Sequence, residues 1–416
     1  MYLTTLGQQA RHAFKHISLA ESETRRKTVL AIADHLEKCF DVIRAANQQD
    51  IDLAHAGGMT PALIDRLTLT ESRLNGLVAD VRTLAGLPDP IGEVFDARTL
   101  PNGLKIHRQR VPLGVLGVIY ESRPNVTIDV AALAIKTGNA ALLRGGKETI
   151  HSNLALVNVV HAALRENGLP AETIQFIDSP DRSLVAEMLK LNDYLDVIIP
   201  RGGNGLHQFC RQNATIPVIT GGIGICHLFV DETANLDAAL PVIFNAKTQR
   251  PSVCNSLDTI LVHEKIAAEF LPRVVEHLAP AGVTFRAEPT AAALVNHPTV
   301  YPAGPEDFDT EWLSLILGLK VVPDLDTAIE HIYAHSTFHS DGILTHTPAH
   351  AERFIREVDS AAVFVNASTR FNDGAQLGLG AEVAVSTQRL HARGPMGLPE
   401  LTSYKWVVVG DYIVRA

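Results

Sequence analysis

The stretch Val111–Glu148, VPLGVLGVIYESRPNVTIDVAALAIKTGNAALLRGGKE, decides the fold. The run from Val111 to Tyr120 is nearly all apolar, which predicts a β-strand that is covered on both faces. A helix-length segment follows, and a second apolar run at Ala140–Leu143 then leads into Gly145 and Gly146. This helix-length segment and the apolar run after it begin an alternation of helices and strands, which is typical of α/β folds.

The same alternation of strand-length and helix-length patterns continues to about Val230. Further apolar strand candidates are Ile174–Ile177, Val197–Ile199 and Ile216–Ile219, with amphipathic stretches such as Ser152–Glu166 between them. This alternation predicts a doubly wound parallel sheet, in which ligands bind at the carboxyl ends of the strands. A second α/β stretch follows, with helices expected at Ala234–Asn245 and His263–Leu278 and a strand at Leu257–Val262.

The two ends of the chain have different patterns. Up to about Arg82 the apolar residues recur with helical spacing. After Pro90, an Asn-Gly turn signal precedes Leu104–Arg110, where apolar and polar residues alternate as in a strand. The C-terminal run Tyr404–Val414 is rich in β-formers and contains a Gly-Asp turn. These segments predict a helical lead-in and an additional β-rich element.

Composition narrows the function classes. The chain has 416 residues, enough for two to three domains, and 46% of them are hydrophobic. Lys plus Arg is 36 against 46 for Asp plus Glu, a formal net charge of −10, which argues against binding to the phosphate backbone of nucleic acids. An anionic small molecule needs only a few local cations and is not excluded.

No apolar run approaches the roughly 18 residues of a membrane span, and Met1–Ile17 has no apolar core of a secretory signal. The four cysteines lie far apart in the sequence, which is typical of free thiols in a reducing compartment. We therefore expect a cytoplasmic protein without a membrane partner.

Two strand ends carry glycines and cations. The first, Leu142–Glu148, contains Arg144, Gly145, Gly146 and Lys147, which together with the N-terminus of the next helix suit a phosphate. An ordinary strand-to-helix turn explains the same pattern about equally well. The second, Ile198–Gly205, ends in Arg201 and the pair Gly202-Gly203. Neither matches the P-loop or the G-x-G-x-x-G fingerprint.

Cys254 lies in a polar loop, Lys247–Asn255, just before a predicted strand and close in sequence to the cations Lys247 and Arg250. A thiol near cations can be held as thiolate, the form that attacks an acyl carbon. A lone cysteine is more often a small buried hydrophobe, and that interpretation is favoured for the remaining ones. These are Cys39, Cys210 and Cys226.

His331, His335 and His339 recur every four residues, and histidines at that spacing can bind zinc on a helix. The residues after His335 indicate that the helix stops there, which removes His339 from the shared face. We expect polar packing or substrate contact, and no metal site.

Three segments carry a family resemblance. They are Val111–Glu148, QRPSVCNSLDT at Gln249–Thr259, and VPDLDTAIEHIYAHSTFHSDGI at Val322–Ile343. The chain resembles the gamma-glutamyl phosphate reductases over essentially its whole length, and more widely the aldehyde dehydrogenases. The resemblance implies NADPH-dependent reduction of L-glutamyl 5-phosphate to L-glutamate 5-semialdehyde and phosphate, the second step of proline biosynthesis.

The resemblance also implies roles for individual residues. Cys254 is the expected nucleophile, and the Asn125 amide with the backbone N–H of Cys254 is the expected oxyanion hole. Arg144 and Lys147, beside Gly145 and Gly146, match the strand end that holds the adenosine ribose of the cofactor, here with the 2'-phosphate of NADP.

Gly202 and Gly203 match the turn beneath the cofactor. Glu311 matches the acid that binds the nicotinamide ribose, although a surface helix glutamate is an alternative. The substrate needs at least one fixed cation and an acid for its amine, and for these we expect Arg250, Arg370 and Asp373.

Hydrolytic aldehyde dehydrogenases carry a glutamate beside a Gly-Gly pair, where this chain has Thr220. Because that general base is absent, phosphate is favoured over water as the acyl partner. The alternatives are a hydrolytic semialdehyde dehydrogenase, a cysteine acyltransferase without a nucleotide, and a non-catalytic partner of glutamate 5-kinase. Binding to that kinase is also compatible with catalysis.

The expected fold is α/β and aldehyde-dehydrogenase-like. It comprises a doubly wound parallel-sheet NADP-binding domain (residues 1–103 and 121–227), an α/β catalytic domain (228–389) and a β-flap (104–120 and 390–416). A flap with open edges needs a partner, so we expect a homo-oligomer.

Overall fold

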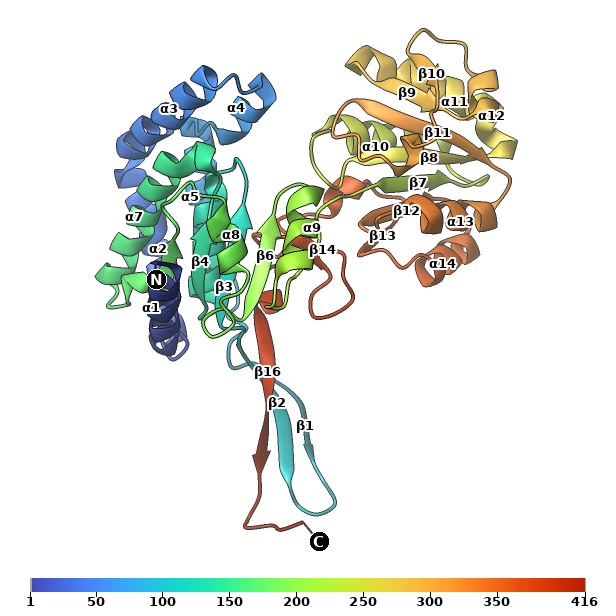
Figure 1. Ribbon diagram of the computed structural model, residues 1–416. Coiled ribbons are helices and arrows are strands. Elements are labelled where there is room, and N and C mark those ends of the chain that lie inside the picture. The colour runs from blue at the N-terminus through green and yellow to red at the C-terminus, as the bar shows by residue number, and fades with distance from the viewer. Residues whose placement is uncertain (1, 416) are drawn as a thin grey trace. The chain divides into compact units, whose positions relative to one another are not determined.

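The computed structural model describes residues 2–415, which form two compact units (Figure 1). Unit 1 covers the chain up to Thr220, residues 378–384 and the segment from Pro395 onward. Unit 2 covers residues 221–377 and 385–394. None of the helices in the described part of the chain combines the length and hydrophobicity that a membrane crossing requires.

The centre of unit 1 is formed by most of the segment Val111–Glu148. Its strand, helix and strand are β3, α6 and β4, and both strands are buried along their whole length. The sheet is parallel throughout, in the order β5-β4-β3-β6. The bounds are β3 (Val115–Tyr120), α6 (Asn125–Lys136), β4 (Ala140–Arg144), β5 (Ile174–Phe176) and β6 (Val197–Arg201).

Helices cover both faces of this sheet because successive side chains of a strand point to opposite faces. On β3, Ile119 packs into a cluster with Leu3 of α1, whereas the Tyr120 hydroxyl lies 2.6 Å from the Thr127 hydroxyl on α6. Helices α1 and α8 contribute to the first face, and α6 and α7 to the second. The doubly wound arrangement is confirmed.

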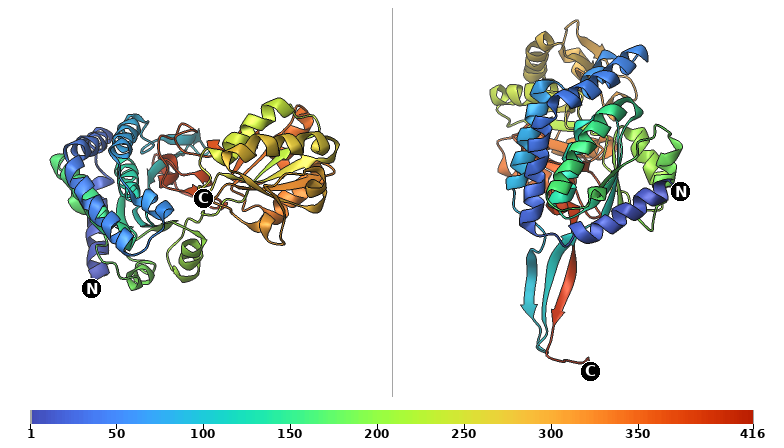
Figure 2. Two further views of the ribbon diagram at one scale, coloured as in Figure 1. Left: turned by 90° about the horizontal axis from the view of Figure 1, so that it is seen from above. Right: turned by 90° about the vertical axis from the view of Figure 1, so that its left-hand side faces the viewer.

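The N-terminal helices complete unit 1, as the helical pattern predicts. Helices α2, α3 and α5 pack on α6 and α7, and the right-hand view of Figure 2 shows these blue helices over the sheet. The remaining bounds are α1 (Tyr2–Ile17), α2 (Ser22–Lys38), α3 (Phe40–Ala56), α4 (Pro61–Leu67), α5 (Glu71–Gly86), η1 (Lys147–Thr149), α7 (Ile150–Glu166), η2 (Ala171–Thr173), α8 (Ser183–Met188) and α9 (Asn204–Asn213).

One expected strand of this unit is not formed. Ile216–Ile219 makes only an isolated parallel bridge, between Val218 and Ile198 of β6. Pro217 lies inside the run, and because proline has no N–H it cannot continue a ladder. Its carbonyl still accepts a hydrogen bond of 2.8 Å from the Ile198 N–H.

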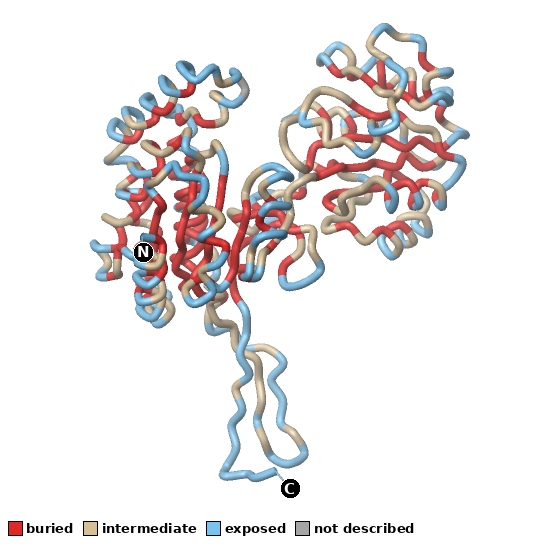
Figure 3. Tube along the Cα trace, in the orientation of Figure 1, coloured by how far each residue is buried: buried red, intermediate tan, exposed pale blue. Residues whose placement is uncertain are grey.

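The flap is a three-stranded antiparallel sheet with β2 at its centre, and most of its residues are partly or fully exposed (Figure 3). The expected bounds are wrong in two places: Val115–Tyr120 is a central strand of the parallel sheet, and β1 belongs to the flap. The C-terminal strand also stops earlier than Val414. The strands are β1 (Val94–Thr99), β2 (Lys105–Pro112) and β16 (Thr402–Val409).

Unit 2 contains a second sheet, which is also parallel throughout, in the order β10-β9-β11-β8-β7-β12-β13. The strand expected at Leu257–Val262 is confirmed as β8. The bounds are β7 (Cys226–Val230), β8 (Leu257–His263), β9 (Thr284–Ala287), β10 (Val300–Pro302), β11 (Ile316–Val322), β12 (Ser340–Leu344) and β13 (Ala362–Val365).

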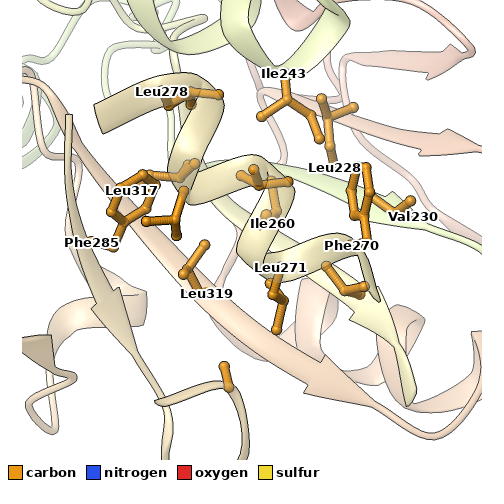
Figure 4. Close-up of a cluster of buried hydrophobic side chains, with 14 of the residues drawn as sticks. Leu228, Val230, Ile243, Ile260, Phe270, Leu271, Leu278, Phe285, Leu317 and Leu319 are labelled. Atoms are coloured by element: carbon orange, nitrogen blue, oxygen red, sulfur yellow. The ribbon is translucent and has the colours of Figure 1, made fainter. Parts of the chain in front are cut away.

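The core of unit 2 lies between this sheet and its helices. Ile260 and Leu319 of the sheet pack against Phe270 and Leu271 of α11 on one face (Figure 4), and α13 and α14 cover the other. Both helices expected after Ala234 are confirmed. The remaining bounds are α10 (Leu236–Thr248), α11 (Glu264–Leu278), η3 (Ala279–Ala281), α12 (Pro289–Leu294), η4 (Asp307–Asp309), α13 (Leu325–His335), α14 (Pro348–Glu357), η5 (Thr369–Phe371), β14 (Val385–Ser386), β15 (Gly394–Pro395) and η6 (Pro399–Leu401).

Truncating this core should destabilise unit 2. Ile260 is fully buried, so Ile260→Ala removes packed methyl groups and leaves a cavity; we expect a loss of about 2–5 kcal/mol. Urea unfolding followed by the fluorescence of Trp312, with Trp406 replaced by Phe in both proteins, measures it. Val42→Ala on α3, where the side chain is 64% exposed, should change stability by less than about 0.5 kcal/mol. Equal midpoints for Ile260→Ala and its parent contradict this picture of the core.

Candidate active site

The loop that carries Cys254 connects α10 to β8, and it is held at the Cys254 carbonyl. A Cβ atom on Gly224 would lie 1.6 Å from that oxygen, so only glycine permits this close approach. The Cys226 thiol donates a hydrogen bond of 3.2 Å to the same oxygen. Burial raises the pKa of the Cys226 thiol well above its usual value, which keeps it protonated as a donor.

Asn255, the next residue, ties this loop to the segment of η5. Its Nδ2 donates to the Asn372 carbonyl at 3.1 Å, and its own carbonyl accepts a 2.8 Å hydrogen bond from the Thr369 hydroxyl. Its Oδ1 accepts a hydrogen bond from Nη1 of Arg370. Asn255 was not among the predicted site residues. The one feature of the sequence that could have pointed to it is its position directly after Cys254.

The predicted substrate residues gather around this loop. Partial burial lowers the pKa of the Arg370 guanidinium, and its charge is felt in turn by Asp373, Arg250 and Cys254. Arg370 forms no ion pair with any carboxylate among residues 2–415. Arg250 is exposed, whereas one oxygen of Asp373 accepts from the backbone N–H groups of residues 375 and 376. Unit 2 therefore brings Cys254 and a cation that forms no ion pair among the described residues into one region.

Glu311 is connected to the Cys254 loop by way of Gly224, which contacts both. Its Oε1 accepts a 3.0 Å hydrogen bond from the Gly224 N–H. The residue lies in an irregular segment and is half-buried, so the alternative of a surface helix glutamate is wrong. Burial raises the pKa of Glu311 to about 7, against the opposing effect of the Gly224 hydrogen bond.

Lys247 does not have the place expected for it. We expected its charge near the thiol, but its Nζ donates to the Leu257 carbonyl at 2.8 Å and lies 3.8 Å from Oδ1 of Asp258. Burial lowers the pKa of Lys247 and raises the pKa of Asp258. Asp258 also accepts from the N–H groups of Cys226 and Trp312, at 3.3 and 3.2 Å. This pair supports the strands beneath the loop.

In unit 1 the candidate cofactor residues lie at the carboxyl ends of the strands. The strand order reverses direction at β3, so the crevice typical of such sheets is expected between the ends of β3 and β6. Gly202 and Gly203 follow β6, and the Gly203 N–H donates to Oε2 of Glu121 at 3.1 Å. A Cβ on Gly202 would lie 2.6 Å from the Glu121 carboxyl, a contact that the sequence analysis missed.

Arg144 ends β4 and is buried without an ion pair in the described part of the chain. Its terminal nitrogens donate only to carbonyls, those of Gly145, Pro180 and Asp181, and its Nε has no hydrogen-bond partner. Lys147 nearby is exposed. A buried guanidinium with only neutral acceptors fits an anionic group such as a phosphate.

Two features of this strand end bear on its expected role in binding phosphate. In the first turn of α7, the N–H groups of His151 and Ser152 already donate to the Asp50 carboxylate, at 3.2 and 2.8 Å. Gly145 and Gly146 also lie close to other side chains of the protein. Cβ atoms there would lie 2.1 Å from Asn153 and 2.2 Å from Glu148.

Asn125 is the first residue of α6 and belongs to unit 1. Its Nδ2 donates a 2.9 Å hydrogen bond to Oδ2 of Asp129, one turn along the helix. Burial raises the pKa of Asp129 to about 7, which the hydrogen bond from Asn125 partly opposes. The amide has a second N–H, which is still free to act as a donor.

The histidine pattern forms no metal site. Helix α13 ends at His335, as expected, and His331 packs against the ring of His227. Among the described residues no group of three or more His, Cys, Asp or Glu side chains is arranged to hold a metal ion. The Nδ1 of His331 lies 3.1 Å from Nζ of Lys320, which is consistent with polar packing.

Comparison with known proteins agrees with this fold. The model of the aldehyde dehydrogenase family matches residues 4–300. Gamma-glutamyl phosphate reductases from Tolumonas auensis and Vibrio parahaemolyticus are 57% and 56% identical to the chain, each over 100% of both sequences. The crystal structure of gamma-glutamyl phosphate reductase from Thermotoga maritima superposes with a TM-score of 0.96 at 48% identity, covering 99% of each chain.

The close approach at Gly224 generates a prediction. In Gly224→Ala the new Cβ displaces the Cys254 carbonyl, so we expect the rate at which iodoacetamide alkylates Cys254 to change at least about tenfold. Peptide mass spectrometry measures the rate. Gly76→Ala on α5, where a Cβ meets no atom within 4 Å, should leave the rate unchanged. An unchanged rate in Gly224→Ala shows that the contact does not hold the loop.

Proposed function

The chain belongs to the aldehyde dehydrogenase family and, within it, to the gamma-glutamyl phosphate reductases, and on that premise we propose how its residues carry out the reaction. The reaction is the NADPH-dependent reduction of L-glutamyl 5-phosphate to L-glutamate 5-semialdehyde and phosphate, in the biosynthesis of proline. The observation that carries the assignment to these residues is the loop of Cys254, in which Asn255 accepts a hydrogen bond from the Arg370 guanidinium.

Cys254 attacks the acyl carbon of the substrate. The thiolate sulfur forms a bond to that carbon, the carbon–oxygen bond to phosphate breaks, and phosphate leaves with the electron pair. The result is a thioester on Cys254. NADPH, when bound, supplies the hydride that reduces this acyl group, and the thiolate leaves as the aldehyde forms.

Each of these steps passes through a tetrahedral oxyanion, which needs fixed donors. We assign this role to the Asn125 amide and the backbone N–H of Cys254. The hydrogen bond from Asn125 to Asp129 supports the assignment because it fixes the orientation of the amide and leaves its second N–H as the donor. Thr220 provides no general base, which favours phosphate over water as the acyl partner.

Most of the cofactor contacts are assigned to unit 1, whereas the nucleophile Cys254 lies in unit 2. Arg144 and Lys147 hold the 2'-phosphate of NADP, as the buried guanidinium with neutral acceptors supports. Gly202 and Gly203 let the cofactor approach the end of β6. Glu311 accepts hydrogen bonds from the nicotinamide ribose.

Substrate contacts are assigned to the residues around Cys254. Arg370 and Arg250 meet the anionic groups of glutamyl phosphate, and Asp373 meets its amine. Arg370 is supported most strongly, because a half-buried cation that forms no ion pair among the described residues favours an anionic ligand.

The flap is the proposed contact between copies of the chain. Its outer strands, β1 and β16, have open edges, and Trp406 and Val408 on β16 are 45% and 57% exposed. A second copy that adds a strand at such an edge gives a homo-oligomer. We also propose a cytoplasmic location, which the free thiols of all four cysteines support, and an association with glutamate 5-kinase that shields the labile acyl phosphate.

Replacing the nucleophile tests the covalent mechanism. Cys254→Ala should lose at least about 10³-fold in kcat with folding retained, because no thioester forms. The measurement is the reverse reaction, in which glutamate semialdehyde, phosphate and NADP produce NADPH absorbance. Cys39→Ala, between α2 and α3, should keep full activity. A Cys254→Ala enzyme with the normal rate rules out the covalent mechanism.

Glu311 should make NADP binding depend on pH. Its carboxylate accepts from the ribose hydroxyls, so with a pKa of about 7 the Kd should fall roughly tenfold from pH 6 to pH 8. Because the folded-state pKa is raised, Glu311 also costs stability as pH rises from about 4.5 through 7. Isothermal titration calorimetry with NADP measures the Kd of the parent and Glu311→Gln proteins at each pH. Comparison of the two proteins separates the contribution of Glu311 from the ionisation of the cofactor itself. If the ratio of the two Kd values is constant with pH, Glu311 does not bind as a carboxylate.

A further inference from the structure

The Arg370 guanidinium is held by neutral side chains. Its Nε donates to Oε1 of Gln249 at 3.1 Å, and its Nη1 donates to Oδ1 of Asn255. Nη2 has no protein partner among residues 2–415, and no carboxylate in that range pairs with the group. The guanidinium is therefore oriented by neutral acceptors and forms no ion pair with a carboxylate of the described residues.

The two acceptors come from different elements and differ in their other contacts. Gln249 is the C-cap residue of α10 and is exposed. Its side chain can therefore be truncated by substitution without disturbing the core. Asn255 is buried, directly follows Cys254, and also donates to the Asn372 carbonyl at 3.1 Å. Only Asn255 thus connects the position of Arg370 to the position of the nucleophile.

We propose that Gln249 and Asn255 are positioning residues that aim Nη2 of Arg370 at the phosphoryl group of the acyl phosphate. This inference rests on the proposed function. Of the two anionic groups of the substrate, the phosphoryl group is attached to the carbon that Cys254 attacks, and Arg370 donates to the side chain of Asn255, the residue directly after Cys254. The guanidinium therefore stabilises the charge that phosphate gains as it leaves.

Amide acceptors suit this task for an electrostatic reason. A carboxylate at either position would orient Arg370 equally well, but its negative charge would cancel the charge that attracts the phosphoryl group. A neutral oxygen fixes the direction of the N–H bonds without that loss. The chemistry of the acceptors, and not only their geometry, is thus part of the inference.

The test is the reverse reaction of the full chain, with KM measured separately for inorganic phosphate and NADP. Gln249→Ala should raise the KM for phosphate roughly tenfold, the loss expected for one hydrogen bond to a charged group, with the KM for NADP unchanged. Gln249→Glu keeps the acceptor oxygen but adds a charge, so its KM for phosphate should rise further. Arg370→Ala should raise the same KM at least as much as Gln249→Ala.

Asn255→Ala should raise the KM for phosphate and also lower kcat, because it releases the nucleophile loop as well. Matched controls are Gln48→Ala, an exposed glutamine on α3, and Asn47→Ala, a buried asparagine that donates to the Leu67 carbonyl. Asn47→Ala loses comparable buried hydrogen bonds and should lower stability with the KM for phosphate unchanged. If Asn255→Ala does not fold, the three variants at Gln249 and Arg370 still decide the question.

A Gln249→Glu enzyme with the KM of the parent overturns the inference, because it means that only an acceptor oxygen is needed. A Gln249→Ala enzyme that matches Gln48→Ala in the KM for phosphate overturns it as well. Failure of the proposed function is distinguishable: the unaltered protein then shows no phosphate-dependent reduction of NADP at any phosphate concentration.

Discussion

The close approach of Gly224 to the Cys254 carbonyl is the constraint on which the site of unit 2 depends. The missing Cβ lets the two backbones meet, and the same residue donates its N–H to Glu311. One glycine therefore positions the loop of the nucleophile and the acid assigned to the nicotinamide ribose. The thiol of Cys226 and the buried Asp258 reinforce this arrangement from beneath, through hydrogen bonds to backbone groups. A side chain at position 224 would therefore displace the Cys254 carbonyl.

The arginines assigned to the cofactor and to the substrate are both held by neutral hydrogen-bond acceptors. Arg144 in unit 1 donates to backbone carbonyls, and Arg370 in unit 2 donates to the amide oxygens of Gln249 and Asn255. Neither is paired with a carboxylate among the described residues. Partial burial of an unpaired charge costs stability, and an anionic ligand offsets that cost when it binds. Lys247 illustrates the opposite arrangement, since its partner Asp258 leaves no charge for a ligand.

Much of the fold was predictable because it follows from local patterns. The apolar runs predict β3, β4 and β8, and the end of α13 at His335 follows from the polar residues after it. The sequence-based predictions differ from the structure where a single residue, or a segment distant in the chain, determines the local structure. Pro217 prevents a strand that its apolar neighbours favour. At the start of α7 the anion is Asp50, which is about a hundred residues away and invisible to any local motif.

The sequence by itself determined the family, the reaction and the candidate nucleophile, because the motif around Cys254 and the alternation of strands and helices are properties of the chain order. Tertiary structure alone decided which polar groups meet. Asn255 and Gln249 carry no signal in the sequence, and their role depends on η5 bringing Arg370 to them. For Lys247 the sequence predicts a charge near the Cys254 thiol. In the folded protein the side chain is buried instead, and its charge lies beside Asp258. A hydrogen bond or ion pair joins atoms that only the folded backbone places within about 3 Å of one another, so residue types in order cannot specify it.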